Sequence, residues 1–272
     1  MADDARVHPQ GPSYSADVAA ASWIAPRLGG GLGTVGGVVP TGYPAYARLL
    51  HPVDDGDGAP VRWADVAART GRSVHPLVQW HRLVGSDDPW NADGAEVEDG
   101  PPRRGTLPPA DLDALLGVLS RHTGTPDDCW FCVWDGWAWV AKTPGSVAFL
   151  VASAFEGTAP PEPEHGPPGF TAEQLAGPRV RLPGRSYLLL RGPLASARFV
   201  GDQVTSDWFD PQFPNLCWPA DRAWCVGTEI DVDSTLVAGS RELVDELLTH
   251  PQLEALEVQP ADSLTADADQ VN

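Results

Sequence analysis

The chain has 272 residues with 37 acidic and 18 basic side chains, which gives a formal net charge of −19. This balance excludes the nucleic-acid backbone as a main partner, because that role requires concentrated positive charge, and it disfavours docking on an anionic membrane surface. Apolar residues make up 42% of the chain, which is enough to build a hydrophobic core.

The predicted elements mix helices and strands along the whole chain. We expect a disordered leader over residues 1–12 and one domain over residues 13–272. Loops are predicted at 85–105, which is rich in Asp and Glu, and at 157–170, which is rich in Pro. Helices are predicted over Ser15–Ile24, 61–69, 107–122 and Arg241–His250, and strands over Tyr43–His51, Leu77–Val84, Cys129–Val151, Ser186–Arg191 and Arg222–Val232. This order predicts an α+β fold in which a few helices flank a mixed, mainly antiparallel sheet.

The segment Cys129–Ala141, CWFCVWDGWAWVA, predicts a β-hairpin whose two-residue turn is Asp135–Gly136. Period-two alternation then places four tryptophans on one face of the ribbon: Trp130, Trp134, Trp137 and Trp139. Two interpretations remain open for them. They either anchor the core, or they form an aromatic wall beside a ligand groove, since an indole combines a flat apolar body with one N–H donor.

Two further motifs are predicted to be structural. On a regular strand, Cys129 and Cys132 point to opposite faces, so they can neither form a redox pair nor share a metal ion. The run Gly31-Leu-Gly33-Thr-Val-Gly36 matches the dinucleotide-binding pattern, but the following residues are not expected to form the required helix. We therefore expect Gly29–Gly37 to be an exposed loop or a lead into a strand, and we expect neither a metal nor a cofactor.

The sequence contains no marked hydrolase, zinc-protease or P-loop motif. Among the histidines, His81 alternates with Trp80 in a predicted strand. It is either a buried general base or a hydrogen-bonded core residue.

Residues 221–272 carry 12 acidic and 2 basic side chains. In the predicted strand Ala223–Asp233, alternation places Glu229, Asp231 and Asp233 on one face and an apolar row on the other. These carboxylates could bind a hard cation, act in acid–base chemistry, or meet a basic partner. They could also be a solvated face that prevents edge-to-edge association. We expect the strand to lie in the same sheet as the tryptophan hairpin.

Three stretches together resemble an uncharacterised family of soluble, acidic, Trp-rich proteins from GC-rich bacteria: CWFCVWDG, SYLLLRGPL and WPADRAWCVGTEIDVDSTLVAGSRELVDELL. The resemblance covers most of the chain from about Val38 and implies one whole-chain unit, but no activity. The composition also resembles that of immunity proteins that neutralise toxins.

The sequence alone does not determine a function. We expect a non-catalytic binding protein that presents an acidic, aromatic-edged surface to a basic protein or cationic ligand. The residues predicted to form this surface are Glu229, Asp231, Asp233, Trp134, Trp137 and Trp139. The alternatives are an enzyme with a carboxylate-based or metal-assisted site, and a structural member of a larger assembly. The N-terminus has no apolar signal segment and no long apolar window follows, so a cytoplasmic location with reduced cysteines is predicted.

Overall fold

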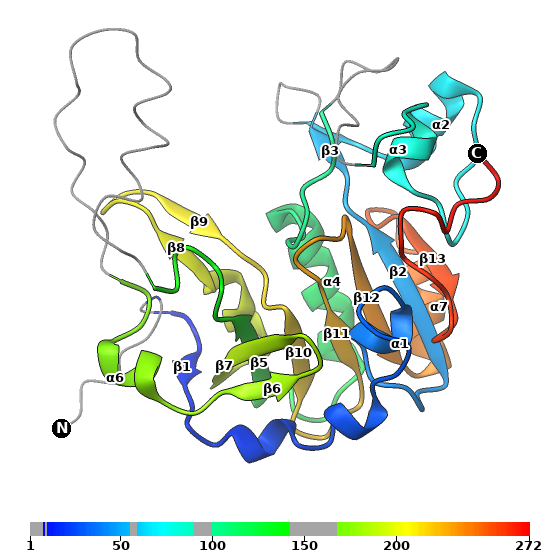
Figure 1. Ribbon diagram of the computed structural model, residues 1–272. Helices are drawn as coiled ribbons and strands as arrows, with labels where there is room; N and C mark the ends of the chain where they lie inside the picture. Colours follow the sequence, from blue (N-terminus) through cyan, green and yellow to red (C-terminus); the bar gives the residue numbers. More distant parts are fainter. Residues whose placement is uncertain (1–7, 9, 55–58, 90–99, 142–167) are drawn as a thin grey trace, which may run out of the picture.

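One large antiparallel sheet organises the computed structural model, which describes residues 8, 10–54, 59–89, 100–141 and 168–272. Its nine strands in the described part are β1 (Ser13–Tyr14), β2 (Ala45–Leu50), β5 (Cys129–Trp134), β6 (Val180–Leu182), β7 (Arg185–Gly192), β10 (Leu216–Pro219), β11 (Cys225–Gly227), β12 (Ser234–Gly239) and β13 (Ala255–Val258). Across the sheet their order is β1-β7-β5-β10-β11-β12-β2-β13, and β6 pairs with β7 on the same side as β1 (Figure 1). The predicted α+β class is confirmed.

Shorter elements complete the described part of the chain. Two small ribbons are formed by β3 (Val53–Asp54) with β4 (Pro60–Val61), and by β8 (Gly201–Gln203) with β9 (Phe209–Pro211). The helices are α1 (Val35–Val38), α2 (Trp63–Thr70), α3 (Trp80–Leu83), α4 (Pro109–Arg121), α6 (Ala172–Ala176) and α7 (Arg241–Leu248), with 3-10 helices at η1 (Val18–Ala21), η2 (Ala25–Arg27) and η3 (Leu194–Phe199).

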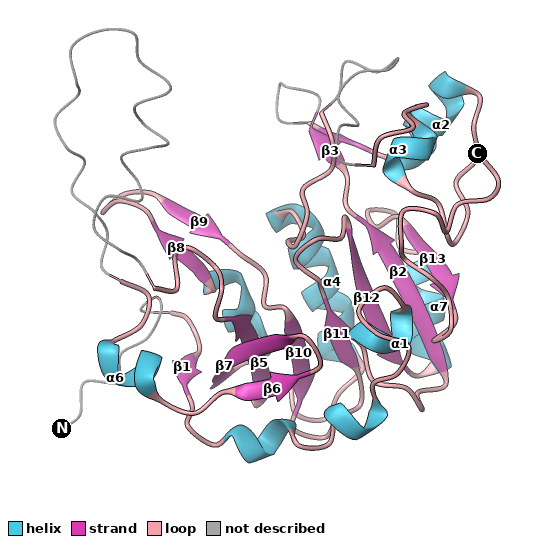
Figure 2. Cartoon of the chain, viewed as in Figure 1, coloured by secondary structure: helices cyan, strands magenta, loops and turns pink. Residues whose placement is uncertain are grey.

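The helices cover the sheet on both faces, and Figure 2 shows the strands running between them. On one face, α4 buries its leucine stripe against the sheet, and the Trp224 indole N–H donates to the Leu119 carbonyl at 3.1 Å. On the other face, the N-terminal 3-10 helices and α1 pack on β5, β10 and β12. A smaller core joins α2 to α3, where the rings of Trp63 and Trp80 meet edge to face. This third core places α3 beside one end of the sheet.

Several predicted elements are confirmed by the structure. The helix predicted before Gly71 ends there because Gly71 adopts a left-handed conformation with φ of 70°. Ser240 caps α7 by accepting a hydrogen bond from the Leu243 N–H at 3.2 Å. On β5, Cys129 and Cys132 lie on opposite faces of the sheet, as alternation predicted.

The predicted tryptophan hairpin is wrong. After β5 ends at Trp134, the next residues form successive turns in which the Val140 N–H donates to the Trp137 carbonyl at 3.0 Å. Strand β5 pairs instead with two remote strands, β7 and β10. The four tryptophans therefore do not share one face, since Trp139 packs in the core beneath α4 while Trp130 packs on the opposite side.

Three other local predictions need correction. Leu77–Val84 forms the short helix α3 rather than a strand, because its apolar residues pack against α2 instead of entering a ladder. The helix predicted over Ser15–Ile24 is the shorter 3-10 helix η1. The strand predicted over Arg222–Val232 is shortened to β11, and it does lie in the same sheet as β5, with β10 between them. Residues 1–7 and 9 of the predicted leader lie outside the described residues, as do 90–99, 142–151 and 157–167 of the predicted loops and strand.

The glycine-rich run has a structural explanation. Its second half is not an exposed loop, as predicted, but the buried one-turn helix α1, capped by Thr34, whose side chain accepts from the Gly37 N–H at 3.1 Å. A Cβ atom at Gly37 would lie only 1.6 Å from the Gly31 carbonyl oxygen. Glycine is therefore required at Gly37 by a close approach of the backbone to itself.

Candidate functional site

The three predicted carboxylates lie on the connection between β11 and β12, which we name the acidic loop (Thr228–Asp233). The strand ends at Gly227, where the backbone packs tightly against α1: a Cβ atom would lie 2.9 Å from a Val38 side-chain carbon. The loop then turns, and the Val232 N–H donates to the Glu229 carbonyl at 3.1 Å. Since this is a turn and not a strand, the carboxylates do not share one strand face, which corrects the sequence interpretation.

Arg185, on β7, joins two of these carboxylates to one of the predicted tryptophans. Its guanidinium donates to Glu229 Oε1 from Nε at 3.0 Å and to Asp231 Oδ2 at 3.0 Å. Its central carbon also lies 5.2 Å from the ring centroid of Trp134. Glu229 is only 7% exposed in this arrangement, whereas the Asp231 side chain is 61% exposed. Asp231 is therefore the carboxylate that remains accessible.

The third carboxylate, Asp233, pairs with a buried arginine of the sheet. Its Oδ1 lies 3.5 Å from a guanidinium nitrogen of Arg48, a fully buried residue in the middle of β2. Arg48 also donates to Ser234 Oγ at 2.9 Å and to the Val78 carbonyl at 2.8 Å. Burial lowers the pKa of Arg48, and the charge of Asp233 opposes that effect. Arg48 thus ties the acidic loop to the chain that leads into α3.

Beside this ion pair, a chain of hydrogen bonds fixes the tautomer of His51. Its Nδ1 lies 2.7 Å from the Arg103 carbonyl, which can only accept, so Nδ1 carries the proton and Nε2 accepts from Thr235 at 2.9 Å. The hydroxyl of Thr235 in turn lies 2.8 Å from that of Thr228. Burial lowers the pKa of His51 to about 4, so this imidazole is neutral at pH 7.

The remaining predicted tryptophans differ in their burial and in the residues that they contact. Trp137 is half-buried, meets Trp134 edge to face at 5.6 Å, and donates from Nε1 to Asn215 Oδ1 at 3.1 Å. Trp139 is buried and stacks on Phe170. Trp134 lines a broad shallow hollow of about 400 Å³ together with Arg185. The structure therefore brings Trp134 and Trp137 close to the acidic loop and leaves Trp139 in the core.

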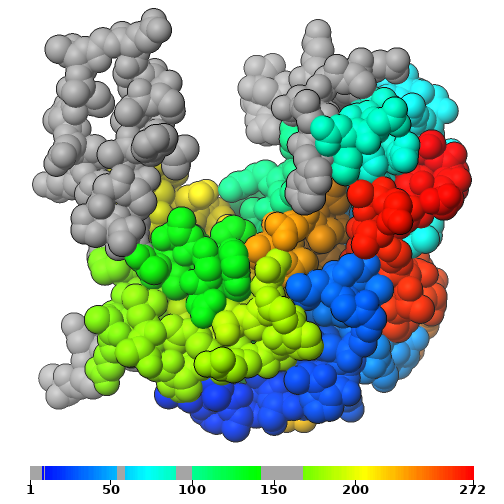
Figure 3. Space-filling model, in the orientation of Figure 1, coloured from blue at the N-terminus to red at the C-terminus, as the bar shows by residue number. Residues whose placement is uncertain are grey.

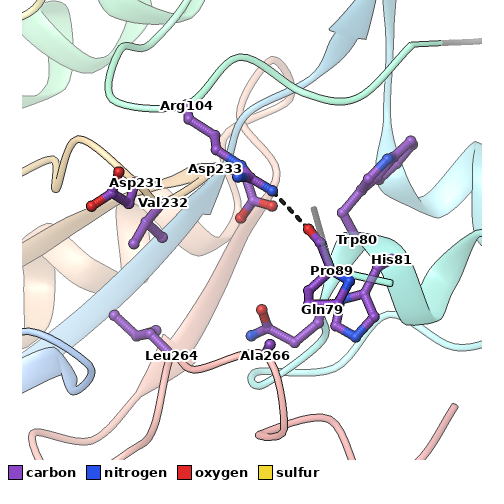
Figure 4. Close-up of a pocket in the computed structure, with 10 residues that line it drawn as sticks. All are labelled: Gln79, Trp80, His81, Pro89, Arg104, Asp231, Val232, Asp233, Leu264 and Ala266. Atoms are coloured by element: carbon purple, nitrogen blue, oxygen red, sulfur yellow. Dashed lines mark hydrogen bonds between the residues drawn. The ribbon is translucent and has the colours of Figure 1, made fainter. Parts of the chain in front are cut away.

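A small polar pocket opens on the other side of the acidic loop (Figure 4). It encloses about 90 Å³ and is lined by Gln79, Trp80, His81, Pro89, Arg104, Asp231, Val232, Asp233, Leu264 and Ala266. Four parts of the chain meet there, and Figure 3 shows three of them adjoining on one face as the cyan, orange and red residues. The rim includes Arg104, whose guanidinium donates to the Pro89 carbonyl at 2.9 Å.

His81 contributes a titratable group to this pocket. The residue is only 5% exposed, and none of the described residues hydrogen-bonds to its imidazole. Burial and the charge of Arg82 lower the pKa of His81. In the sequence, His81 stands out only as a lone histidine, because its proximity to Asp231 and Asp233 depends on contacts between distant segments.

The C-terminal residues hold the pocket wall in place through Asp269. Its buried carboxylate accepts hydrogen bonds from the Gln79 N–H at 3.2 Å, from His75 Nε2 at 2.9 Å and from the Asn272 side chain at 2.9 Å. Although burial raises the pKa of Asp269, the hydrogen bonds from Asn272, Val271 and Gln79 lower it below its usual range, so the carboxylate stays ionised. Leu264 and Ala266 are thereby fixed beside α3.

In the described part of the chain, no group of three or more His, Cys, Asp or Glu side chains is arranged to hold a metal ion. No helix in the described ranges is long and apolar enough to cross a membrane.

Comparison of the chain with protein-family models, curated proteins and solved structures finds no match. The resemblance of three sequence stretches to an uncharacterised family therefore stays a prediction.

Proposed function

We propose that this protein is a non-catalytic binding protein that receives a basic partner at the acidic loop. One observation carries the proposal: Asp231 and Asp233 line the same pocket, and the Asp231 side chain is 61% exposed to solvent. A pocket lined by carboxylates offers a partner's cation a recessed, partly desolvated position, in which charge pairs are stronger than on an open surface. The polar pocket is therefore the centre of the proposed interface.

The internal arginines preorganise this surface. Arg185 holds Glu229 and Asp231, and Arg48 holds Asp233, so the loop does not need to become ordered when a partner arrives. The two arginines also offset part of the local negative charge. Specific recognition at this site therefore depends on the geometry of the pocket, whereas the net charge of −19 attracts basic molecules over longer distances.

Aromatic side chains border the acidic loop on its other side. Trp134 lies beneath Arg185 and lines the shallow hollow next to the loop. Tryptophan is enriched at the centres of protein interfaces because it buries a large area with little loss of conformational freedom. The proposed surface thus combines a polar pocket with an aromatic hollow, and a partner contacting both would span the acidic loop.

Binding of a fluorescently labelled, arginine-rich peptide, followed by anisotropy, tests the proposal. The Asp231→Asn variant should bind the peptide about fivefold more weakly, which corresponds to about 1 kcal/mol for one partly exposed charge contact. The matched control is Asp245→Asn on α7, because that side chain is 60% exposed and the charge change is the same.

The two variants must differ for the proposal to stand. Equal losses in both would mean that the peptide responds only to net charge. Unchanged binding in Asp231→Asn would mean that the acidic loop is not the binding site.

A further inference from the structure

We propose that the polar pocket takes the guanidinium group of one arginine of the basic partner, and that His81 accepts a hydrogen bond from it. This inference rests on the proposed function, because it assigns the partner's chemistry at the same acidic loop. It adds an acceptor that does not belong to the loop and a dependence on pH that general charge attraction does not have.

The size of the pocket limits what can enter. A cavity needs roughly 10–15 Å³ to hold one water molecule. The polar pocket, with a volume of about 90 Å³, therefore has room for about six water-sized groups. Pockets for drug-sized ligands are several times larger, at roughly 300–1,000 Å³. A guanidinium group with its adjoining methylene group fits this space, whereas a nucleotide or a sugar does not. The occupant is therefore the end of a side chain.

The residues of the acidic loop already bind guanidinium groups. Glu229 and Asp231 accept from Arg185, and Asp233 faces Arg48. A guanidinium has several N–H donors in one plane and can contact two carboxylates at once. It is also more weakly hydrated than an ammonium group, so entering a partly enclosed pocket costs it less. These properties favour arginine over lysine as the inserted side chain.

His81 is the independent observation that points to a ligand. Its imidazole is nine-tenths buried, lines the pocket, and has no hydrogen-bond partner among the described residues. In Figure 4 it lies on the wall opposite Asp231 and Leu264. A neutral imidazole has one nitrogen that accepts and one that donates. An N–H group placed between the acidic loop and α3 would satisfy the acceptor.

The charged groups around His81 determine how this contact responds to pH. Four charged groups act on its pKa: Arg82 on the same helix, and the carboxylates Asp87, Asp233 and Asp269. Two more, Asp231 and Arg104, line the pocket with it. Burial and Arg82 keep the imidazole neutral at pH 7, so it accepts a hydrogen bond there. Once protonated, it loses its acceptor and repels a cation. Binding should therefore weaken as the pH falls through the pKa of His81.

Three labelled peptides separate recognition of the guanidinium from attraction by net charge. They have the same sequence apart from one residue type, which is arginine, lysine or citrulline, the neutral analogue of arginine. The full-length protein should bind the arginine peptide at least threefold more tightly than the lysine peptide and at least tenfold more tightly than the citrulline peptide. Equal binding of the arginine and lysine peptides would overturn the assignment of a guanidinium pocket.

Variants around the pocket test the role of His81. His81→Gln keeps an acceptor but does not titrate, so it should bind normally at pH 7.5 and lose the weakening at lower pH. His81→Phe removes the acceptor and should bind about fivefold more weakly. Arg104→Gln removes a like charge from the rim and should tighten binding about twofold to threefold. The folded state of each variant is checked by circular dichroism.

The outcomes distinguish this inference from the proposed function. If Asp231→Asn weakens binding but both His81 variants match the wild type at every pH, the pocket assignment fails and the acidic loop remains the site. If neither Asp231→Asn nor the His81 variants affect binding, both proposals fail. Saturable binding of N-acetyl-arginine amide without binding of the arginine peptide would overturn the assignment to a macromolecular partner.

Discussion

Arg48 and Asp233 form a buried ion pair between strand β2 and the acidic loop, with 3.5 Å between guanidinium nitrogen and carboxylate oxygen. The guanidinium is also satisfied by Ser234 and by the carbonyls of Pro76 and Val78. Removing one partner from such a pair leaves an uncompensated buried charge, which costs about 3–5 kcal/mol. The pair therefore controls the stability of the region around the polar pocket.

Replacing Arg48 with methionine should lower the free energy of unfolding by about 3–5 kcal/mol, as measured by urea denaturation. The control is Arg198→Met, which removes an exposed partner of Asp113 and should change the free energy of unfolding by less than about 1 kcal/mol. The double variant Arg48→Met with Asp233→Asn should be more stable than the sum of the two single effects predicts. Additive effects would mean that the pair does not interact.

His51 should make the free energy of unfolding depend on pH. Its pKa is about 4 in the folded protein and about 6.5 when unfolded, so the unfolded state binds a proton first as the pH falls. Stability from this group is complete above pH 6.5 and declines below it, by about 2.5 kcal/mol at pH 4.5. His51→Gln should flatten the dependence by that amount. A slope equal to that of the wild type would contradict the assignment of a neutral, buried imidazole.

In the glycine-rich run Gly29–Gly37, substitution by alanine should change the free energy of unfolding very differently at two positions. Gly37→Ala should lower the free energy of unfolding by more than about 3 kcal/mol, because its Cβ would overlap the Gly31 carbonyl. At Gly29 a Cβ would meet nothing within 4 Å, so Gly29→Ala should be neutral or slightly stabilising. Thermal unfolding of both variants checks this. Comparable losses would mean that the close approach at Gly37 is not what requires glycine there.

All four cysteines should be inert in the folded protein. Each is buried, and burial raises the pKa of Cys129 to about 12 and raises those of Cys132, Cys217 and Cys225 as well. Because the thiolate is the reactive form, N-ethylmaleimide at pH 7.5 should label the thiols only after unfolding in urea. Mass spectrometry reports the number of labels. Rapid labelling of the native protein would place at least one thiol at the surface.

Local patterns were enough to predict the elements whose signals are local. The leucines of α4 recur at helical spacing, and Ser240 stands where a helix cap is needed, so both helices could be predicted from neighbouring residues. The Asp135–Gly136 dipeptide correctly predicts a turn, in which the Trp137 N–H donates to the Trp134 carbonyl at 3.3 Å. The predicted hairpin is nevertheless wrong, because β7 and β10 pair with both sides of β5 and leave no side for a strand that returns from this turn.

The candidate site could be predicted only in part. Sequence alternation identified Glu229, Asp231 and Asp233, but not the arginines that hold them, because Arg185 lies on β7 and Arg48 lies on β2. The sequence also singles out His81, but the strand predicted around it is wrong, because His81 lies in helix α3. Its place in the pocket depends on α3 meeting the acidic loop and the C-terminal residues, and no local spacing encodes that contact.

The position of β2 has a consequence for folding during synthesis. Its neighbours in the sheet are β12 and β13, and the hydrogen-bonded pair Arg48 and Ser234 is separated by 186 positions in the sequence. A ribosome therefore releases β2 long before either neighbouring strand exists. The apolar residues of β2 remain without their native contacts until β12 and β13 have emerged. Because such remote pairings form slowly, the nascent chain has a prolonged need for protection against aggregation.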